Sequence, residues 1–208
     1  MSPGKRIMDI LVASALLPVA APVMAVIALV LLVGQGRPVF HISRRCHTPG
    51  RTFGLFKFRT MTVAPDGGGA TGGDKAARIT PLGRWLRAHR LDELPQLINI
   101  LRGELSLVGP RAPLPEYVDR FPDLYARVLR NRPGVTGLAT VVFQGHEARL
   151  LSACRTAAET DAMYARRCIP RKARLDLIYQ RRRSVLLDLW VLARTLRVAA
   201  RPGAGVMR

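Results

Sequence analysis

The feature that most constrains this chain is an apolar segment near its N-terminus. Residues 7–33 carry one charged side chain, that of Asp9, in 27 positions. A straight helix of this length would extend roughly 40 Å, which is more than a hydrocarbon core of about 30 Å requires. The segment is too long for the apolar part of a signal peptide, and no small-residue cleavage site follows it. The sequence therefore favours a membrane-inserted helix over a helix buried in a soluble core.

Two features of this segment favour a re-entrant hairpin over a single crossing. Pro18 and Pro22 stand in its middle, where each removes a backbone hydrogen bond and disturbs the preceding turn. Basic residues flank both ends, and the positive-inside rule places such residues on the cytoplasmic side. A hairpin satisfies both flanks, whereas a single crossing satisfies only one. We therefore predict a hairpin with its hinge at Pro18 and Pro22. The basic flanking residues are Lys5, Arg6, Arg37, Arg44 and Arg45.

The remainder of the chain predicts a mainly α fold with a small β component, an α+β class. We expect residues 1–36 to form the membrane-anchoring helix and residues 37–208 a single cytoplasmic domain. The apolar periodicity and the turn residues predict short strands, helices and one Gly-rich loop. The strands fall within 37–45 and 52–61, the helices at 81–90, 94–102 and 183–201, and the loop at 64–74.

The predicted helix at 183–201 carries an apolar face opposite several arginines. This pattern is typical of an amphipathic helix that lies on an anionic membrane, and equally of one that packs its apolar face onto the domain. The pattern by itself does not choose between the two.

The charge balance predicts an anionic partner. The chain has 33 Lys and Arg against 14 Asp and Glu, a formal net charge of +19. Nucleic acid, anionic lipid and phosphorylated small molecules are the three kinds of partner that would balance this positive charge. No nucleic-acid-binding motif accompanies the charge, so we expect no nucleic-acid partner. The three cysteines and four histidines show no spacing typical of a disulfide framework or a zinc site.

Asp92 and Glu93 are adjacent carboxylates in the Arg-rich stretch RAHRLDELPQL. The simplest interpretation is the start of a helix, because Asp is a common N-cap, Glu suits a first turn and Pro95 is tolerated there. The alternative is a site that handles phosphate, which needs cations for the ligand and a carboxylate as nucleophile or Mg²⁺ ligand. On this second interpretation, nearby arginines would keep Asp92 ionised. Arg111 is the most specific of the cations, because it follows a Gly-Pro turn that would hold it in place.

Several segments together resemble the bacterial sugar transferases, the monotopic polyprenyl-phosphate phosphoglycosyl transferases. They occur in the family's order over roughly residues 5 to 200, and the length is similar to that of the small form of the family. The block from Leu82 to Arg111 is the most specific. One difference is that the family usually breaks its re-entrant helix at Ser-Pro, where this chain has Ala21-Pro22. The segments are KRIMDILVA, APVMAVIALVLL, FKFRTM, LGRWLRAHRLDELPQLINILRGELSLVGPR, RPGVTGLA and YQRRRSVLLDLWVLART.

The resemblance implies a fold, a reaction and a set of residues. It implies a re-entrant helix in the bacterial inner membrane, with the globular part and its amphipathic interface helices on the cytoplasmic face. The reaction would move a sugar 1-phosphate from a UDP-sugar to a polyprenyl phosphate, usually undecaprenyl phosphate, with Mg²⁺ and release of UMP, as the first membrane step of glycan or exopolysaccharide assembly. Asp92 would be the nucleophile and a metal ligand, and Glu93 its catalytic partner. The substrate-binding positions would be Lys57, Arg59, Arg87, Gln96 and Arg111.

Two alternatives remain open at this point. One is an inactive membrane scaffold of the same fold, and the other is a basic module that binds phosphate or lipid. Retention of the carboxylate pair among cations favours the enzyme over the scaffold. The sugar, the polyprenol length, the glycan pathway and the oligomeric state are left open.

Overall fold

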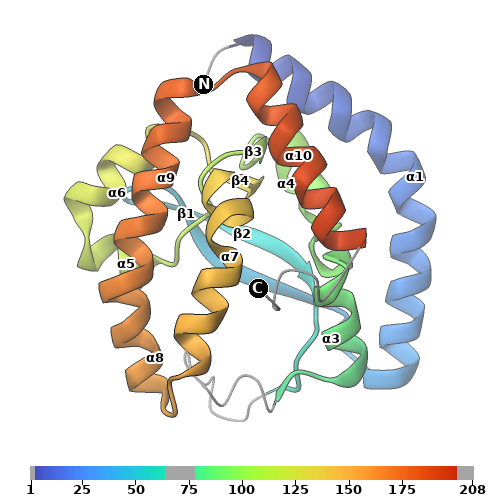
Figure 1. The fold of residues 1–208 in the computed structure, drawn as a ribbon. Helices are drawn as coiled ribbons and strands as arrows, with labels where there is room; N and C mark the ends of the chain where they lie inside the picture. The colour runs from blue at the N-terminus through green and yellow to red at the C-terminus, as the bar shows by residue number, and fades with distance from the viewer. Residues whose placement is uncertain (1–2, 64–77, 201–208) are drawn as a thin grey trace.

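The structure is a computed structural model, and it describes residues 3–63 and 78–200. The described residues are mostly helical, with two small two-stranded sheets near the centre (Figure 1). The predicted α+β class is therefore confirmed. The loop predicted at 64–74 lies outside the described residues.

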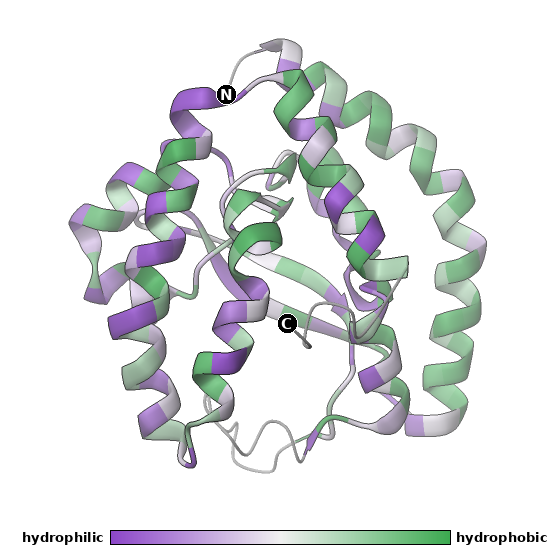
Figure 2. Ribbon diagram, viewed as in Figure 1, coloured by the Kyte–Doolittle hydropathy of each residue, from purple (hydrophilic) through white to green (hydrophobic). Residues whose placement is uncertain are grey.

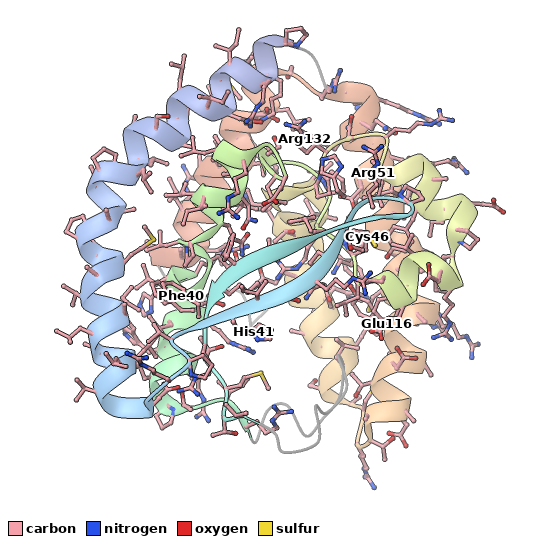
Figure 3. All side chains as sticks on the ribbon, turned by 180° about the vertical axis from the view of Figure 1, so that it is seen from behind. Phe40, His41, Cys46, Arg51, Glu116 and Arg132 are labelled. Atoms are coloured by element: carbon pink, nitrogen blue, oxygen red, sulfur yellow. The ribbon has the colours of Figure 1, made fainter. Side chains whose placement is uncertain are left out.

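The N-terminal apolar segment forms one long helix, α1 (Pro3–Gln35), with Pro18 and Pro22 inside it. It is the one helix, in the part of the chain that the structure describes, long and apolar enough to cross a membrane. Figures 1 and 3 show that α1 bends as it passes along one side of the molecule, and two antiparallel arms are not seen. Prolines inside a helix are a usual cause of such bends. The predicted hairpin therefore stays a prediction.

Both ends of α1 are attached to the same globular body. Near its start, Arg6 donates from Nη1 to the carbonyl of Ile100 (2.6 Å) and from Nη2 to that of Leu101 (2.9 Å). At its end, Arg59 Nη2 donates to the carbonyls of Gln35 (2.6 Å) and Gly36 (2.9 Å). The buried residues of α1 lie only toward its two ends; they are Asp9, Ala13, Ile27 and Leu31. The stretch from 14 to 26, which holds both prolines, has no buried residue.

The antiparallel hairpin of β1 (Phe40–Thr48) and β2 (Arg51–Phe58) crosses the body, as Figure 3 shows from behind. Gly50, in the turn, has a φ of 77°, a conformation that side chains other than glycine rarely adopt. Leu55 and Phe58 of β2 are buried and belong to two separate apolar clusters. The two strands predicted within 37–45 and 52–61 are therefore confirmed, with ends shifted by a few residues.

The stretch after residue 80 forms α3 (Pro81–Ala88), the 3₁₀ turn η1 (Leu91–Glu93) and α4 (Gln96–Arg102). Thr80 caps α3 by accepting a hydrogen bond from the Gly83 amide (3.0 Å), and Pro81 occupies the first turn, where its missing N–H costs nothing. Arg90, with a φ of 57°, ends this segment and starts η1. The two predicted helices are confirmed, and the residues between them form a separate tight turn.

A parallel pair, β3 (Ser106–Val108) and β4 (Gly134–Thr136), lies beside the hairpin. The connection between them contains α5 (Pro115–Arg120) and α6 (Pro122–Val128). Gly134 approaches the backbone of Gly109 so closely that a Cβ at position 134 would collide with the Gly109 amide nitrogen. This crossing therefore needs glycine.

Five helical segments complete the described chain: α7 (Leu138–Ser152), α8 (Ala157–Met163), the π-helical turn η2 (Tyr164–Cys168), α9 (Ile169–Arg182) and α10 (Val185–Ala200). Helix α10 buries Asp188 and Val191 against the body and leaves Leu186 and Leu196 exposed. One face of α10 thus packs onto the domain, and another exposes apolar side chains that could lie on a membrane, so both alternatives for this helix stay open. Figure 2 shows that apolar residues follow much of α1 and α10, whereas α5, α8 and α9 carry more polar ones.

Candidate active site

Asp92 and Glu93 lie in the turn η1, between α3 and α4, and both are buried. The residue that begins α4 is preceded by Pro95, and no side chain caps that helix. Among the described residues, neither carboxylate makes a capping bond to a backbone amide, so the interpretation of the pair as a cap of α4 is wrong. The reason is tertiary: Arg90 turns the chain into η1 before α4 starts, and Glu93 is drawn to cations from other elements.

Glu93 is held by three cations. Arg90 approaches Glu93 Oε2 at 2.7 Å, and Arg111 and Lys57 approach Oε1 at 3.3 and 3.5 Å. Burial alone would raise the pKa of Glu93, but the charges of Arg111, Arg90 and Lys57 outweigh burial and hold this pKa far below its ordinary value. Glu93 is therefore an ionised group that orders the cations around it.

Asp92 is in the opposite situation, although it is the next residue. Within the described part of the chain, its carboxylate makes no hydrogen bond or ion pair. Burial, and then the charge of Glu93, raise the pKa of Asp92 above 3.8, while Lys57, Arg87 and Arg111 act against this rise. The expectation that nearby arginines keep Asp92 ionised stays a prediction: Arg87 and Arg111 do favour the charged form, and burial opposes them. A buried carboxylate with free oxygens and several cations nearby is suited to act as a nucleophile or metal ligand.

Lys57 and Arg87 supply cations from β2 and α3. Burial, and then the charge of Arg111, lower the pKa of Lys57 to about 8. Arg87 Nε donates to the hydroxyl of Thr60 at 2.8 Å, and burial lowers the pKa of Arg87 while Asp92 and Glu93 oppose that shift. These two side chains therefore place positive charge beside both carboxylates.

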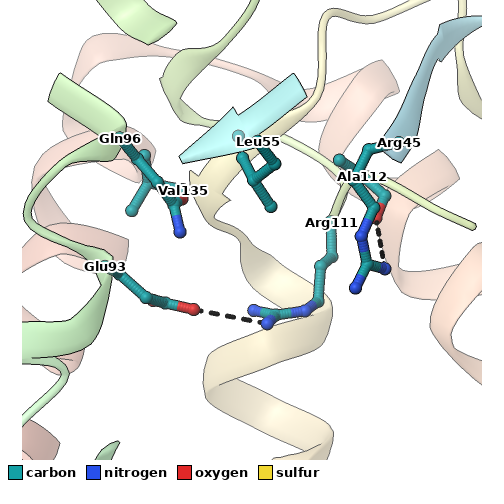
Figure 4. A pocket seen from close by; sticks show the side chains of 8 residues that line it. Arg45, Leu55, Glu93, Gln96, Arg111, Ala112 and Val135 are labelled. Atoms are coloured by element: carbon teal, nitrogen blue, oxygen red, sulfur yellow. Dashed lines mark hydrogen bonds and ion pairs between the residues drawn. The ribbon is translucent and has the colours of Figure 1, made fainter. Parts of the chain in front are cut away.

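Arg111 reaches the site from the end of β3. The residue pairs with Gly134 across the parallel sheet, and the Gly134 amide donates to the carbonyl of Pro110 at 2.8 Å. Its side chain remains 37% exposed, so the guanidinium can contact both Glu93 and a ligand. Figure 4 shows Arg111 directed toward Glu93 in a pocket that also includes Gln96 and Arg45. The expectation that the Gly-Pro turn holds Arg111 beside the carboxylates agrees with this geometry.

The remaining two predicted substrate-binding residues lie in different surroundings. Gln96 is buried in the wall of this pocket, and its Nε2 has no hydrogen-bond partner among the described residues. Arg59 bonds instead to the carbonyls of residues 35, 36 and 37 at the end of α1. The structure therefore brings Gln96 to the carboxylates with Lys57, Arg87 and Arg111, and it places Arg59 as a link to the apolar helix.

Sequence reasoning missed one further cation at the site, Arg45. Arg45 lines the pocket from β1 and donates from Nη1 to the carbonyl of Ala112 (3.3 Å), and burial lowers its pKa to about 10. Its location depends on the antiparallel register that pairs it with Phe53, and no local pattern predicts that register. Arg90 belongs to the arginines that the sequence places around the carboxylate pair, and the structure pairs it with Glu93.

The site fits Mg²⁺ with Asp92 as the protein ligand and substrate phosphates as the other ligands. No group of three or more His, Cys, Asp or Glu side chains that could hold a metal occurs among the described residues. Mg²⁺ is often held by one or two carboxylates together with substrate phosphates. Asp92, whose oxygens have no protein partner in the described chain, fits that role, whereas Glu93 is already neutralised by three cations.

Fold and site together define a class: an α+β domain attached to a long apolar helix, with a buried carboxylate pair among cations and with Glu93, Arg45 and Arg111 in one small pocket. Comparison with known proteins gives the family. The family model described as bacterial sugar transferase matches residues 2–202. The chain therefore belongs to the bacterial sugar transferase family.

Individual relatives agree with this assignment. The chain is 39% identical over 137 residues to an uncharacterized sugar transferase, EpsL, of Bacillus subtilis, covering 66% of this chain and 67% of the relative. It is 40% identical over 144 residues to the UDP-glucose:undecaprenyl-phosphate glucose-1-phosphate transferase of Caulobacter vibrioides, covering 66% and 53%. It is 33% identical over 201 residues to the undecaprenyl-phosphate glucose phosphotransferase of Komagataeibacter xylinus, covering 93% and 35%. The chain thus spans between about a third and two thirds of the length of these relatives.

Proposed function

We propose that this protein transfers a sugar 1-phosphate from a UDP-sugar to a polyprenyl phosphate, such as undecaprenyl phosphate, and releases UMP. The observation that carries the proposal is the division of roles within the carboxylate pair. Glu93 is neutralised by three cations, and Asp92 keeps its oxygens available beside Lys57, Arg87 and Arg111. The names of the Caulobacter and Komagataeibacter relatives support the same reaction.

In the first step, an oxygen of the Asp92 carboxylate attacks the sugar-bearing phosphorus of the UDP-sugar. The bond from that phosphorus to the UMP oxygen breaks, so UMP leaves and Asp92 carries the sugar phosphate as an acyl phosphate. Arg111 and Lys57 offset the negative charge that gathers on the phosphoryl oxygens. A raised pKa makes the Asp92 carboxylate a stronger nucleophile once it is ionised.

In the second step, a phosphate oxygen of the polyprenyl phosphate attacks the same phosphorus, and the bond to Asp92 breaks. The product is a polyprenyl diphosphate sugar, and the Asp92 carboxylate is restored. Glu93 keeps Arg90, Arg111 and Lys57 in place through both steps. Mg²⁺, held by Asp92 and substrate phosphates, would supply further neutralisation of phosphate charge.

We further propose that α1 is re-entrant, so that the globular body lies on the cytoplasmic face of the bacterial inner membrane. Both ends of α1 are hydrogen-bonded to one body, through Arg6 and Arg59. A single crossing would separate those ends by the thickness of the bilayer, and the same body would have to contact both. In the stretch 14–26, which holds both prolines, Leu17, Ala20 and Met24 pack against the body, and the exposed apolar side chains opposite them are the part available for insertion.

The central test is UMP release by the purified full chain with Mg²⁺ and a panel of UDP-sugars. With a UDP-sugar alone, we expect UMP in an amount no greater than the enzyme present and a phosphosugar mass on the peptide that contains Asp92. Addition of undecaprenyl phosphate should then allow multiple turnovers. Asp92→Asn preserves the side-chain size and should lose both the adduct and turnover.

A matched control is Asp123→Asn, which removes a carboxylate from the exposed first turn of α6. This variant should keep normal turnover. Near-normal turnover of Asp92→Asn would instead contradict the covalent mechanism. Absence of UMP release by the unaltered chain with every UDP-sugar in the panel would favour the alternative of an inactive scaffold of the same fold.

A further inference from the structure

A second pocket, of about 370 Å³, lies beside β3 and shares no lining residue with the pocket of the candidate active site. The start of α1, β3, the residues before β4, the end of α9 and the start of α10 enclose it. Its volume is within the range of small-molecule pockets. No residue assigned to the transfer reaction lines this pocket.

The polar part of this pocket presents hydrogen-bond donors. Asn131 is 9% exposed, and its Nδ2 has no partner among the described residues. Its Oδ1 accepts a hydrogen bond from Arg183 Nη1 at 3.3 Å, so the donor half of the amide is the half that remains available. Arg132 Nη1 is also buried without a partner in the described chain. Figure 3 shows Arg132 in the half of the molecule that holds the start of α1. Buried donors of this kind are rare in native structures and call for an acceptor.

Asp188 lines the pocket, Asp9 follows Met8 of its lining, and both carboxylates are already engaged. Asp9 accepts from Lys5 Nζ and from the hydroxyl of Ser106, both at 2.7 Å. Asp188 accepts from Tyr179 at 2.6 Å and pairs with Lys5 at 2.9 Å. The pocket therefore has donors and positive charge to offer, and an anion is the ligand that matches them.

The guanidinium groups of Arg132 and Arg6 lie near each other and add to the positive charge beside the pocket. Arg132 and Arg6 both point toward the position of Gly103, at the end of α4. Burial, and then the charge of Arg6, lower the pKa of Arg132. An anion bound beside Arg132 would relieve both effects.

Part of the pocket wall is apolar and adjoins the long apolar helix α1. Met8 of α1, Val108 of β3 and Val185 of α10 line it. Met8 lies in the first turns of α1, whose apolar length follows, and Leu186, next to Val185, is exposed. A ligand with an anionic group and an adjoining apolar part would use both halves of the pocket.

We propose that this pocket binds the phosphate group of a membrane phospholipid. Asn131 Nδ2 and the guanidinium groups of Arg132 and Arg183 hold the phosphate oxygens, and the apolar wall contacts the first carbons of the lipid chains. A phospholipid headgroup and free inorganic phosphate would present the same phosphate oxygens to this pocket. The test therefore separates these two ligands. The inference does not depend on the transfer reaction, and its test uses no catalytic readout.

The test is a titration of the full chain in neutral detergent micelles, with bound lipid counted by native mass spectrometry. The probes are phosphatidylglycerol, diacylglycerol, which has the chains without the phosphate, and inorganic phosphate as a competitor. The variants are Asn131→Asp, which replaces the free donor with an oxygen, and Arg183→Gln. Arg182→Gln is the matched control: Arg182 is the exposed last residue of α9, directly before Arg183, it does not line the pocket, and its substitution changes the net charge by the same amount as Arg183→Gln.

We expect saturation at one phosphatidylglycerol per chain and no saturable binding of diacylglycerol. Asn131→Asp and Arg183→Gln should each weaken phosphatidylglycerol binding about tenfold or more, since both remove a charge-assisted hydrogen bond. Arg182→Gln should stay within about twofold of the unaltered chain. Inorganic phosphate that competes at equal affinity would support the phosphate site and assign it to the free anion. Equal affinities for all three variants, or no saturable lipid binding, would overturn the proposal.

Discussion

At the scale of single residues, the site depends on the different surroundings of two adjacent carboxylates, which shift their pKa values in opposite directions. Glu93 meets cations from three elements, and the pKa of this carboxyl is lowered. Asp92 meets no direct partner in the described chain, and burial raises its pKa. Adjacent residues of a helical turn point in directions about 100° apart, so a ligand-facing role and an organising role can belong to neighbours.

Lys57 gives the site a pH limit that can be measured. Because burial lowers the pKa of Lys57 to about 8, this cation is lost as the pH rises through 8, and kcat/KM should fall there. Lys57→Arg keeps its charge above pH 10 and should remove this fall, although the absolute rate will be lower. The pH profile of UMP release measures this effect.

The control for this prediction is Lys172→Arg. Lys172 is also largely buried, but Tyr164 and Glu147 hold its pKa above the ordinary value. Its substitution should therefore leave the alkaline limb at the same pH. An unchanged limb in Lys57→Arg would show that another group sets it. At the acidic end, the raised pKa of Asp92 means that this carboxylate is protonated at a higher pH than an ordinary aspartate, so the acid limb should lie above pH 3.8.

Arg111 is expected to matter more than an arginine on the surface. Arg111→Ala removes a cation beside both carboxylates and should lower kcat/KM by roughly 100-fold, a typical loss for a group that stabilises transition-state charge. Arg167→Ala, at an exposed position of η2, should have little effect. Steady-state kinetics on both variants measures the difference. Equally small losses would show that Arg111 acts like any solvent-exposed arginine and has no role in the reaction.

At the scale of elements, the short parallel pair β3 and β4 positions Arg111. The pair depends on the close approach of Gly134 to Gly109, which leaves no room for a Cβ. The same crossing holds the Gly-Pro turn before Arg111. A disturbance of this crossing should therefore reach the site as well as the core.

Gly134→Ala tests this dependence. The added Cβ would collide with backbone atoms that cannot rotate away, so we expect destabilisation of about 2 kcal/mol or more. Gly34→Ala, at an open position inside α1, should not destabilise the protein, because alanine is the better helix former. Thermal denaturation in detergent compares the two. Equal stability of both variants would mean that the strands can shift to accept the Cβ.

At the scale of the whole molecule, the two ends of α1 are attached to one body. Arg6 joins its start to the end of α4, and Arg59 joins its end to the strand that carries Lys57. Movement of α1 would therefore displace Arg59. This residue directly follows Phe58, the last residue of β2, and lies two residues after Lys57.

This attachment predicts the membrane topology. Single cysteines at Gly4 and Arg37, placed in a chain whose Cys46, Cys154 and Cys168 are replaced by serine, should both react with a membrane-impermeant thiol reagent from the cytoplasmic side. Both positions are exposed. Labelling of inverted and right-side-out vesicles measures the accessibility. Reaction of the two cysteines from opposite sides would show a single crossing.

Local patterns by themselves determined a large part of this protein. The apolar run predicted a long N-terminal helical segment, the pattern of residues 37–61 predicted the two strands that form β1 and β2, and the block around Asp92 and Glu93 predicted the family. These properties are encoded in neighbouring residues, because helix and strand formation and motif spacing depend on short stretches of chain.

The tertiary structure alone decided which of the candidate side chains meet. It brought Arg45 to the pocket, assigned Arg59 to the end of α1, and raised the pKa of Asp92 while lowering that of Glu93. Each outcome depends on burial and on contacts between residues distant in sequence, such as Glu93 with Arg111. Hydrogen bonds and electrostatic shifts follow distance in space, and a one-dimensional pattern does not contain that distance.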